Sequence, residues 1–234
     1  NRERAGHVKV KGLADYVTQV DTDIQSFLAR ELGNRFPDIQ FLGEEEGLHE
    51  MSGDTYWILD PIDGTTNLIH DYQHSVVSLA LYEKGEITLG IIYDPLREDV
   101  YHAQKGTGSF LNGVPIHVSD AETLGETIIT VGTSPYDREV ADENFKRIRR
   151  VFDHAQDIRR TGTAAMDLAY VACGRTGGFF GPKLSPWDFA AGQLLVKEAG
   201  GRVTDFAGEE LDFLQRGSVV ASNGKVHEEL LGLL

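Results

Sequence analysis

The chain has 234 residues, of which 41% are hydrophobic and 25% charged, which suits a globular protein with one large domain or two joined lobes. Its formal charge of −15 argues against a nucleic acid or an anionic membrane surface as a partner. Cys173 is the only cysteine, which excludes an intrachain disulfide and a cysteine-based zinc site and favours a cytoplasmic location. No apolar run approaches the ~18 residues of a membrane span and no signal peptide is visible, although a start at Asn1 leaves a removed N-terminal piece open.

A helix is predicted near the start of the chain. In the stretch DTDIQSFLARELGNRF, apolar residues recur at the spacing of one helix face, which predicts a helix over 21–36. Asp21 or Thr22 is the expected N-cap, and Gly33 is the expected end.

A largely antiparallel sheet is predicted to follow. Two short β-rich runs, 39–43 and 56–60, each end at acidic residues. The segment 75–118 is then predicted to be an antiparallel meander that opens with a tight hairpin at Lys84-Gly85.

The second half of the chain alternates between helices and strands, which predicts α/β layering. The expected strands lie near 127–132, Ile158, 177–180, 202–205 and 218–222, and the expected helices over 138–154, 163–173 and 188–199. The chain is therefore divided near residue 130 into an N-terminal α+β lobe, 1–130, and a C-terminal α/β lobe, 131–234, within one compact unit.

The run WILDPIDGTTN, residues 57–67, indicates a site for a cation and a phosphate. Pro61 holds Asp60 in an extended conformation at the end of a buried strand, so that Asp63 can curl back toward the same point beside the Ile62 carbonyl. Oxygen ligands of this kind suit Mg²⁺. The glycine, threonines and asparagine that follow offer hydroxyl and backbone N–H groups to an anion at a helix start. The alternative is that Asp63 only caps a helix and Asp60 only ends a strand.

Three further acidic clusters have ordinary structural explanations when each is taken alone. GEEEG, residues 43–47, suits a solvated loop; Asp188 in SPWDFAAG suits the N-terminal end of a helix; Asp21 in YVTQVD suits an N-cap. If the strand before GEEEG lies beside YWILD, however, Glu44 and Glu45 reach the same sheet edge as Asp60.

The order and spacing of GEE, WILDPIDGTTNLIH and SPWDFAAGQLLVKEAGG resemble the inositol monophosphatase family over nearly the whole chain. VTQVD, KGTGSFLNG and GTAAMDLAYVACG resemble further elements of that family. The resemblance implies a layered αβαβα sandwich and a Mg²⁺-dependent, lithium-sensitive phosphatase with two or three metal ions per site, commonly a homodimer.

The resemblance also implies roles for particular residues. The first metal ion would be held by Glu44, Asp60 and the Ile62 carbonyl, the second by Asp60, Asp63 and Asp188, and a third, weaker ion would lie near Glu45. The attacking water would be oriented and deprotonated by Thr65 and Asp21 together with Glu44. The substrate would be bound by Asp63, Gly64, Thr65, Thr66, Gly162, Thr163, Ala164 and Asp188.

Two departures from the family pattern leave the substrate and the metal count open. Gly181 stands where inositol-specific relatives have a glutamate that contacts the sugar hydroxyls. Inositol monophosphate is therefore the first expected substrate, with fructose 1,6-bisphosphate or a nucleotide phosphate such as NADP⁺ as alternatives. Lys183 could favour a second phosphate, although a surface lysine is the simpler interpretation. The lysine of the family's mobile metal-binding loop corresponds to Lys9 or Lys11.

A few other residues are assigned ordinary roles. His70 and His74 have zinc-compatible spacing but no evident third ligand, so surface or packing roles are expected. Phe179 and Phe180 are expected either to line the substrate pocket or to pack in the core. A regulatory or binding protein that keeps the phosphatase fold is the alternative of a different functional class.

Overall fold

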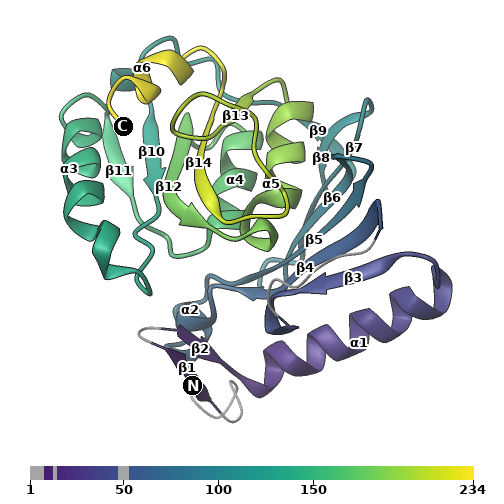
Figure 1. The fold of residues 1–234 in the computed structure, drawn as a ribbon. Helices are drawn as coiled ribbons and strands as arrows, with labels where there is room; N and C mark the ends of the chain where they lie inside the picture. Colours follow the sequence, from purple (N-terminus) through teal and green to yellow (C-terminus); the bar gives the residue numbers. More distant parts are fainter. Residues whose placement is uncertain (1–7, 13–14, 47–52) are drawn as a thin grey trace.

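The computed structural model describes residues 8–12, 15–46 and 53–234, which form five layers in the order αβαβα (Figure 1). Helix α1 (Gln19–Arg35) lies on the outer face of a seven-stranded sheet. Helices α4 (Ala164–Ala172) and α5 (Pro186–Glu198) lie between this sheet and a five-stranded sheet. Helices α3 (Ala141–Phe152) and α6 (His227–Leu231) cover the far side of the second sheet. The predicted layered sandwich is confirmed.

The seven-stranded sheet contains the predicted meander. Its strands, in spatial order, are β3 (Gln40–Gly43), β4 (Thr55–Asp63), β5 (Val76–Glu83), β6 (Glu86–Asp94), β7 (Asp99–Gln104), β8 (Gly108–Leu111) and β9 (Val114–Ile116). β3 is parallel to β4, and every later neighbour is antiparallel. The predicted hairpin is confirmed at Lys84 and Gly85, whose φ angles of 51° and 96° match a tight turn that suits the strand twist. A short ribbon of β1 (Lys9–Gly12) and β2 (Asp15–Val17) precedes α1.

The five-stranded sheet is mixed. Its spatial order is β11 (Asp157–Arg159), β10 (Ile128–Val131), β12 (Gly178–Leu184), β14 (Gly217–Ser222) and β13 (Arg202–Thr204). Successive residues of a strand face opposite sides, so Phe179 packs with the central helices and Phe180 packs with the outer ones. Both phenylalanines are therefore buried in the core, and Phe179 also lines the cleft described below. The expected lobe boundary at 130 falls within β10, and α4 and α5 contact both sheets.

Several element boundaries differ from the sequence predictions. Thr18, rather than Asp21 or Thr22, is the N-cap of α1, and Asp21 closes a capping box by accepting from the Thr18 N–H at 2.9 Å. The helix continues through Gly33 to Arg35, because an exposed glycine costs a helix only about 1 kcal/mol. The helix expected from 188 begins at Pro186, a residue preorganised for the first helical position.

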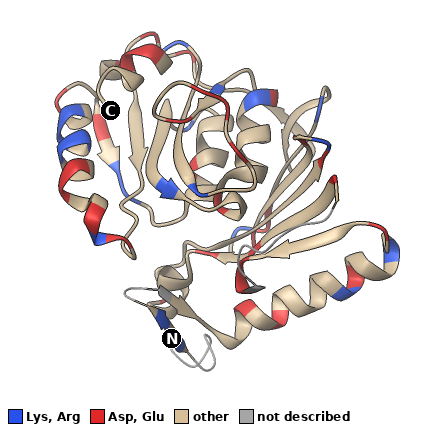
Figure 2. Cartoon of the chain, in the orientation of Figure 1, with Lys and Arg blue, Asp and Glu red and all other residues tan. Residues whose placement is uncertain are grey.

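Three further predictions of length or number were wrong. The strand expected over 177–180 extends to Leu184, the helix expected over 138–154 divides into a 3₁₀ turn (Arg138–Val140) and α3, and α6 was not predicted. Asp and Glu residues occur in both halves of the chain, and on α3 they lie in the first turn with Lys and Arg after them (Figure 2), so the acidic charge is spread over the molecule. No helix in the described residues is both long and apolar enough to cross a membrane.

Candidate active site

The predicted acidic residues meet at one edge of the first sheet. β3 pairs in parallel with β4, with Gly43 opposite Leu59, so Glu44 and Asp60 leave the two strands side by side. A cleft of about 150 Å³ opens at this edge. Of the residues assigned from the sequence, its lining includes Glu44, Asp60, Ile62, Asp63, Gly64, Thr65, Thr66, Gly162, Thr163, Ala164 and Asp188. Asp21 and Glu45 are not part of this lining, but Asp21 is hydrogen-bonded to the lining residue Thr65 and Glu45 directly follows the lining residue Glu44.

The end of β4 directs its two aspartates into the cleft. Pairing with β5 is irregular between Asp60 and Asp63, which bends the strand as a bulge does. Asp60 Oδ1 accepts from the Ile62 N–H at 2.9 Å, and Asp63 Oδ2 accepts from the Ala165 N–H of α4 at 2.6 Å. Asp63 therefore does not cap the following helix, and Asp60 does not end the strand.

Gly64 makes the turn from β4 into the short helix α2 (Thr65–Ile69). Its φ angle is 93°, and a Cβ at this position would lie 3.0 Å from both the His74 carbonyl oxygen and Thr163 Oγ1. Glycine is therefore required here by conformation and by space. The turn places Thr65 and Thr66 at the cleft wall.

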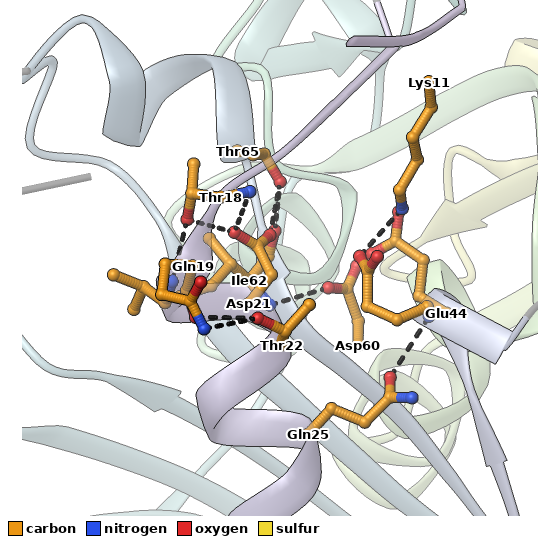
Figure 3. Close-up of polar contacts among 12 residues, drawn as sticks. Lys11, Thr18, Gln19, Asp21, Thr22, Gln25, Glu44, Asp60, Ile62 and Thr65 are labelled. Carbon is orange, nitrogen blue, oxygen red and sulfur yellow. Dashed lines mark hydrogen bonds and ion pairs between the residues drawn. The ribbon is translucent and has the colours of Figure 1, made fainter. Parts of the chain in front are cut away.

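Thr65 is joined to α1 through Asp21 (Figure 3). Thr65 Oγ1 lies 3.0 Å from Asp21 Oδ1 and 3.0 Å from the Ile62 carbonyl oxygen. The other oxygen of the fully buried Asp21 accepts from the N–H and the hydroxyl of Thr18. The capping box of α1 therefore also fixes the carboxylate that holds the Thr65 hydroxyl.

The turn after β3 is held by α1 and by the β1–β2 ribbon. Gln25 Oε1 of α1 accepts from the Glu45 N–H at 3.1 Å. Lys11 Nζ lies 2.8 Å from Glu45 Oε1 and 3.9 Å from Glu44 Oε1 (Figure 3). Of the two lysines that the sequence left open, Lys11 is thus the one that reaches the acidic cluster.

The carboxyl groups of the cleft are strongly perturbed. Burial raises the pKa of Glu44 to about 8 and that of Asp188 to about 6. Burial, followed by repulsion from Glu44, holds the pKa of Asp60 well above its usual range; for Asp63 the causes are burial and then Asp188. Burying several charged carboxylates close together is unfavourable, but it becomes favourable when cations lie between them.

The chemistry of these side chains fits a hard divalent cation. Four carboxylates and one backbone carbonyl supply only oxygen donors, the ligand type that Mg²⁺ prefers. In the described part of the chain, no three acidic, histidine or cysteine side chains already surround one point with the spacing of metal ligands. Glu44 and Asp60 instead repel each other when both are charged, and this repulsion helps to raise the pKa of Asp60. A cation would therefore bind the deprotonated groups in competition with protons.

The comparisons with known proteins agree with this geometry. A model of the inositol monophosphatase family matches residues 1–234. The chain belongs to the inositol monophosphatase family. Nus factor SuhB of Xylella fastidiosa is 42% identical over 210 residues, which cover 90% of this chain and 76% of that relative. Inositol-1-monophosphatase of Mesorhizobium japonicum is 40% identical over 225 residues, which cover 96% of this chain and 84% of that relative.

Solved structures of inositol monophosphatases (IMPases) have the same fold. The Thermotoga maritima IMPase has a TM-score of 0.90 and 38% identity, covering 99% of this chain and 88% of that chain. An IMPase/NADP phosphatase with bound Mg²⁺ and phosphate has a TM-score of 0.88 and 28% identity, covering 97% of this chain and 85% of that chain. Another solved structure is of a staphylococcal IMPase as an inhibitory complex after a soak in LiCl. The IMPase/NADP phosphatase has also been solved in complex with NADP and Ca²⁺.

Some cleft residues of this family member were not predicted from its sequence. They are Tyr16, Val131, Gly132, Thr133, Ser134, Pro135, Tyr136, Arg160, Asp167 and Leu184. Most belong to loops or strands of the second sheet, and no local pattern marks them. Lys183, considered for a second phosphate, forms an ion pair with Asp137 instead and does not line the cleft. His74 packs near the Tyr170 ring, with 6.1 Å between ring centres.

The raised carboxyl pKa values predict how pH affects the metal-free protein. The pKa values of Glu44 and Asp188 exceed their ordinary values of 4.5 and 3.8, so the folded state binds more protons than the unfolded state. Stability should therefore fall as pH rises from about 5 to 8. Mg²⁺ binds the deprotonated groups, so its stabilising effect should grow over the same range.

Thermal unfolding after chelation, at pH 5.5 and pH 8, tests this prediction. At pH 8, Mg²⁺ at one hundred times its dissociation constant should raise the melting temperature by roughly 5–10 °C. The same Mg²⁺ concentration should raise the melting temperature by less at pH 5.5. An equal increase at both pH values would show that binding does not displace protons from this cluster.

Proposed function

We propose that the protein is a Mg²⁺-dependent phosphomonoesterase whose expected substrate is inositol monophosphate or another small phosphorylated polyol or sugar. The observation that carries the proposal is the placement of Glu44, Asp60, Asp63 and Asp188 in one cleft with Thr65. The Thr65 hydroxyl is held at 3.0 Å from Asp21. The family membership and the solved relative with Mg²⁺ and phosphate support the same reaction class.

Specific residues would hold the metal ions. Glu44, Asp60 and the Ile62 carbonyl suit one ion, and Asp60, Asp63 and Asp188 suit a second. Glu45, paired with Lys11, lies at the outer edge where a third, weaker ion would bind. Bound Mg²⁺ would neutralise the phosphate oxygens, lower the pKa of a water molecule and stabilise the departing alkoxide.

The chain's own side chains would position and deprotonate the attacking water. The Thr65 hydroxyl donates its proton toward Asp21, so a lone pair of its oxygen is available to accept a hydrogen bond from water. Glu44 follows the neighbouring parallel strand β3 and, once deprotonated in the presence of bound metal ions, could receive the proton. Because Thr65 is fixed by Asp21 and the Ile62 carbonyl, it acts by orienting water, and no phosphorylated side chain is needed.

Substrate contacts would come from both lobes. The Gly64–Thr66 turn would receive the phosphate, and Asp63 with the 162–164 loop would contact the leaving group. Gly181 supplies no acid for the sugar hydroxyls, and a Cβ there would lie 3.2 Å from Leu184 Cδ1 and 3.3 Å from Phe179 Cζ. An apolar wall therefore takes the place of the acid, which supports substrates beyond inositol phosphate.

A substrate panel tests the proposal. Phosphate release would be measured with Mg²⁺, with and without Li⁺, from inositol 1-phosphate, fructose 1,6-bisphosphate, NADP⁺ and 3′-phosphoadenosine 5′-phosphate. Li⁺-sensitive turnover of at least one compound is expected, and the highest kcat/KM identifies the substrate class. Absence of turnover on the whole panel, by folded protein that binds Mg²⁺, would favour the second candidate.

The second candidate is a regulatory factor that keeps the phosphatase fold. It is favoured by the relatives of 40–42% identity that are named Nus factor SuhB rather than phosphatase. Such a role would use a surface rather than the cleft. An Asp63→Asn variant separates the two roles, because it should remove hydrolysis and leave a surface-based role intact.

A further inference from the structure

The cleft contains one basic side chain among several acidic ones. Among the described residues, its charged lining consists of the basic Arg160 and the acidic Glu44, Asp60, Asp63, Asp167 and Asp188. Four of these acids belong to the proposed metal site. Arg160 follows β11 and precedes α4, so it comes from the second lobe, on the side where the leaving group would lie.

Arg160 spans two loops at this side of the cleft. Its Nε donates to Thr133 Oγ1, on the loop after β10, at 3.3 Å. Its Nη1 lies against Gly162, where a Cβ would approach it to 2.6 Å. Gly162 has a φ angle of 91° and begins the loop assigned to the leaving group. The guanidinium thus lies beside the backbone that would contact the part of the substrate beyond its reacting phosphate.

The charge of Arg160 is not neutralised by an ion pair. Its neighbour Arg159 pairs with Asp157, whereas Arg160 forms no ion pair with any carboxylate in the described parts of the chain. Asp167, a lining acid that the Arg160 charge attracts without forming an ion pair, is fully buried and accepts from Thr161 Oγ1 at 2.8 Å. Arg160 is an exposed residue, so its remaining donors are available to a ligand.

The wall formed by Leu184 and Phe179 adds no negative charge. At Gly181 the acid of inositol-specific relatives is absent, and Leu184 and Phe179 fill the space. A second anionic group on the substrate would therefore meet Arg160 without a facing carboxylate from this wall. A guanidinium presents several N–H donors in a planar fork that matches phosphate oxygens.

We propose that Arg160 is a specificity-determining residue that selects substrates whose leaving group carries a second phosphate. The inference rests on the proposed function, because the metal site would fix the reacting phosphate and so direct the remainder of the substrate toward Arg160. It assigns to Arg160 the role that the sequence had suggested for Lys183.

A matched pair of ligands and a matched pair of variants test the proposal. Fructose 1,6-bisphosphate and fructose 1-phosphate differ only in the second phosphate, and Arg160→Gln and Arg159→Gln remove adjacent arginines. Dissociation constants would be measured by calorimetry in Ca²⁺, the ion present in the NADP complex of the solved relative, and kcat/KM in Mg²⁺.

Wild type should bind the bisphosphate more tightly than the monophosphate. Arg160→Gln should weaken binding of the bisphosphate by about tenfold or more, the effect of a lost charge-assisted hydrogen bond, and that of the monophosphate by less than about threefold. Arg159→Gln should change both by less than about threefold, and Arg160→Lys should keep part of the preference. The same ratios should appear in kcat/KM, mainly through KM.

Other outcomes would overturn the inference. If Arg160→Gln weakened the binding of both ligands equally, Arg160 would act by supporting the buried Asp167. If it changed neither affinity, Arg160 would not contribute to substrate recognition. If wild type bound the two ligands equally, or bound neither, the proposed preference for a second phosphate would also be rejected. Failure of the proposed function is a separate result: no hydrolysis in Mg²⁺, whatever the binding ratios in Ca²⁺.

Discussion

Replacing Asp63 by asparagine is expected to reduce kcat/KM for phosphate release by about a thousandfold or more. It should also make the metal-free protein more stable at neutral pH. The Asp63 carboxylate is buried, and burial together with Asp188 holds its pKa well above the usual range. Asparagine has nearly the same size and can still accept from the Ala165 N–H, but it carries no charge to bind a cation. Activity and the free energy of unfolding, both measured at pH 7.5, should therefore change in opposite directions.

Asp94 provides the matched control. It is also buried, but it pairs with Arg97 Nη1 at 2.7 Å and accepts from the Leu96 N–H at 2.9 Å, away from the cleft lining. Asp94→Asn should lower stability and keep activity within about threefold, since it breaks a structural pair. An active Asp63→Asn variant, or one that is as destabilised as Asp94→Asn, would contradict the assignment of Asp63 to a cation site.

Replacing Thr65 by alanine is expected to lower kcat by about a hundredfold or more, because the water that Glu44 deprotonates would lose the group that orients it. The hydroxyl lies 3.0 Å from Asp21 Oδ1, and its loss leaves water without this acceptor. Because Thr65 is not among the proposed metal ligands, the Mg²⁺ concentration for half-maximal activity should change by less than about threefold. Steady-state kinetics across a Mg²⁺ series measure both quantities.

Thr65→Ser is the control for this prediction. Serine keeps the hydroxyl and lacks only the methyl group, so it should recover most of kcat. If Thr65→Ala changes only the Mg²⁺ requirement, or if serine does not restore turnover, Thr65 acts in metal binding or in folding of the turn rather than on water.

The sequence predicted those parts of the site that lie within continuous motifs. WILDPIDGTTN carries its own geometry, because a buried strand, a proline and a glycine with positive φ fix where Asp60 and Asp63 point. The pairing of β3 with β4 was stated only as a condition under which Glu44 and Glu45 would reach the sheet edge of Asp60, and the structure shows that the two strands do pair. The resemblance to the family then connected Asp21 and Asp188 to the same cleft.

The remainder depended on contacts between distant segments. Nothing local separates Arg160 from Arg159, and only the packing of the loop after β10 places Thr133 beside Arg160. The expected cap of α1, Asp21 or Thr22, was wrong because the helix begins earlier, with Thr18 as the N-cap and Asp21 as the second member of its capping box. The surface role that was the simpler interpretation of Lys183 agrees with the structure, but its partner Asp137, 46 residues away in the sequence, could not be predicted.

The most direct test of the central claim, metal-dependent hydrolysis at this carboxylate cluster, is phosphate release from inositol 1-phosphate across a Mg²⁺ titration of chelated protein. Wild type should release no phosphate without the ion and recover saturable turnover as Mg²⁺ is added, while Asp63→Asn should stay inactive throughout. If release persisted undiminished after chelation, or if Asp63→Asn followed the wild-type curve, the reaction would not depend on this cluster and the account would be wrong.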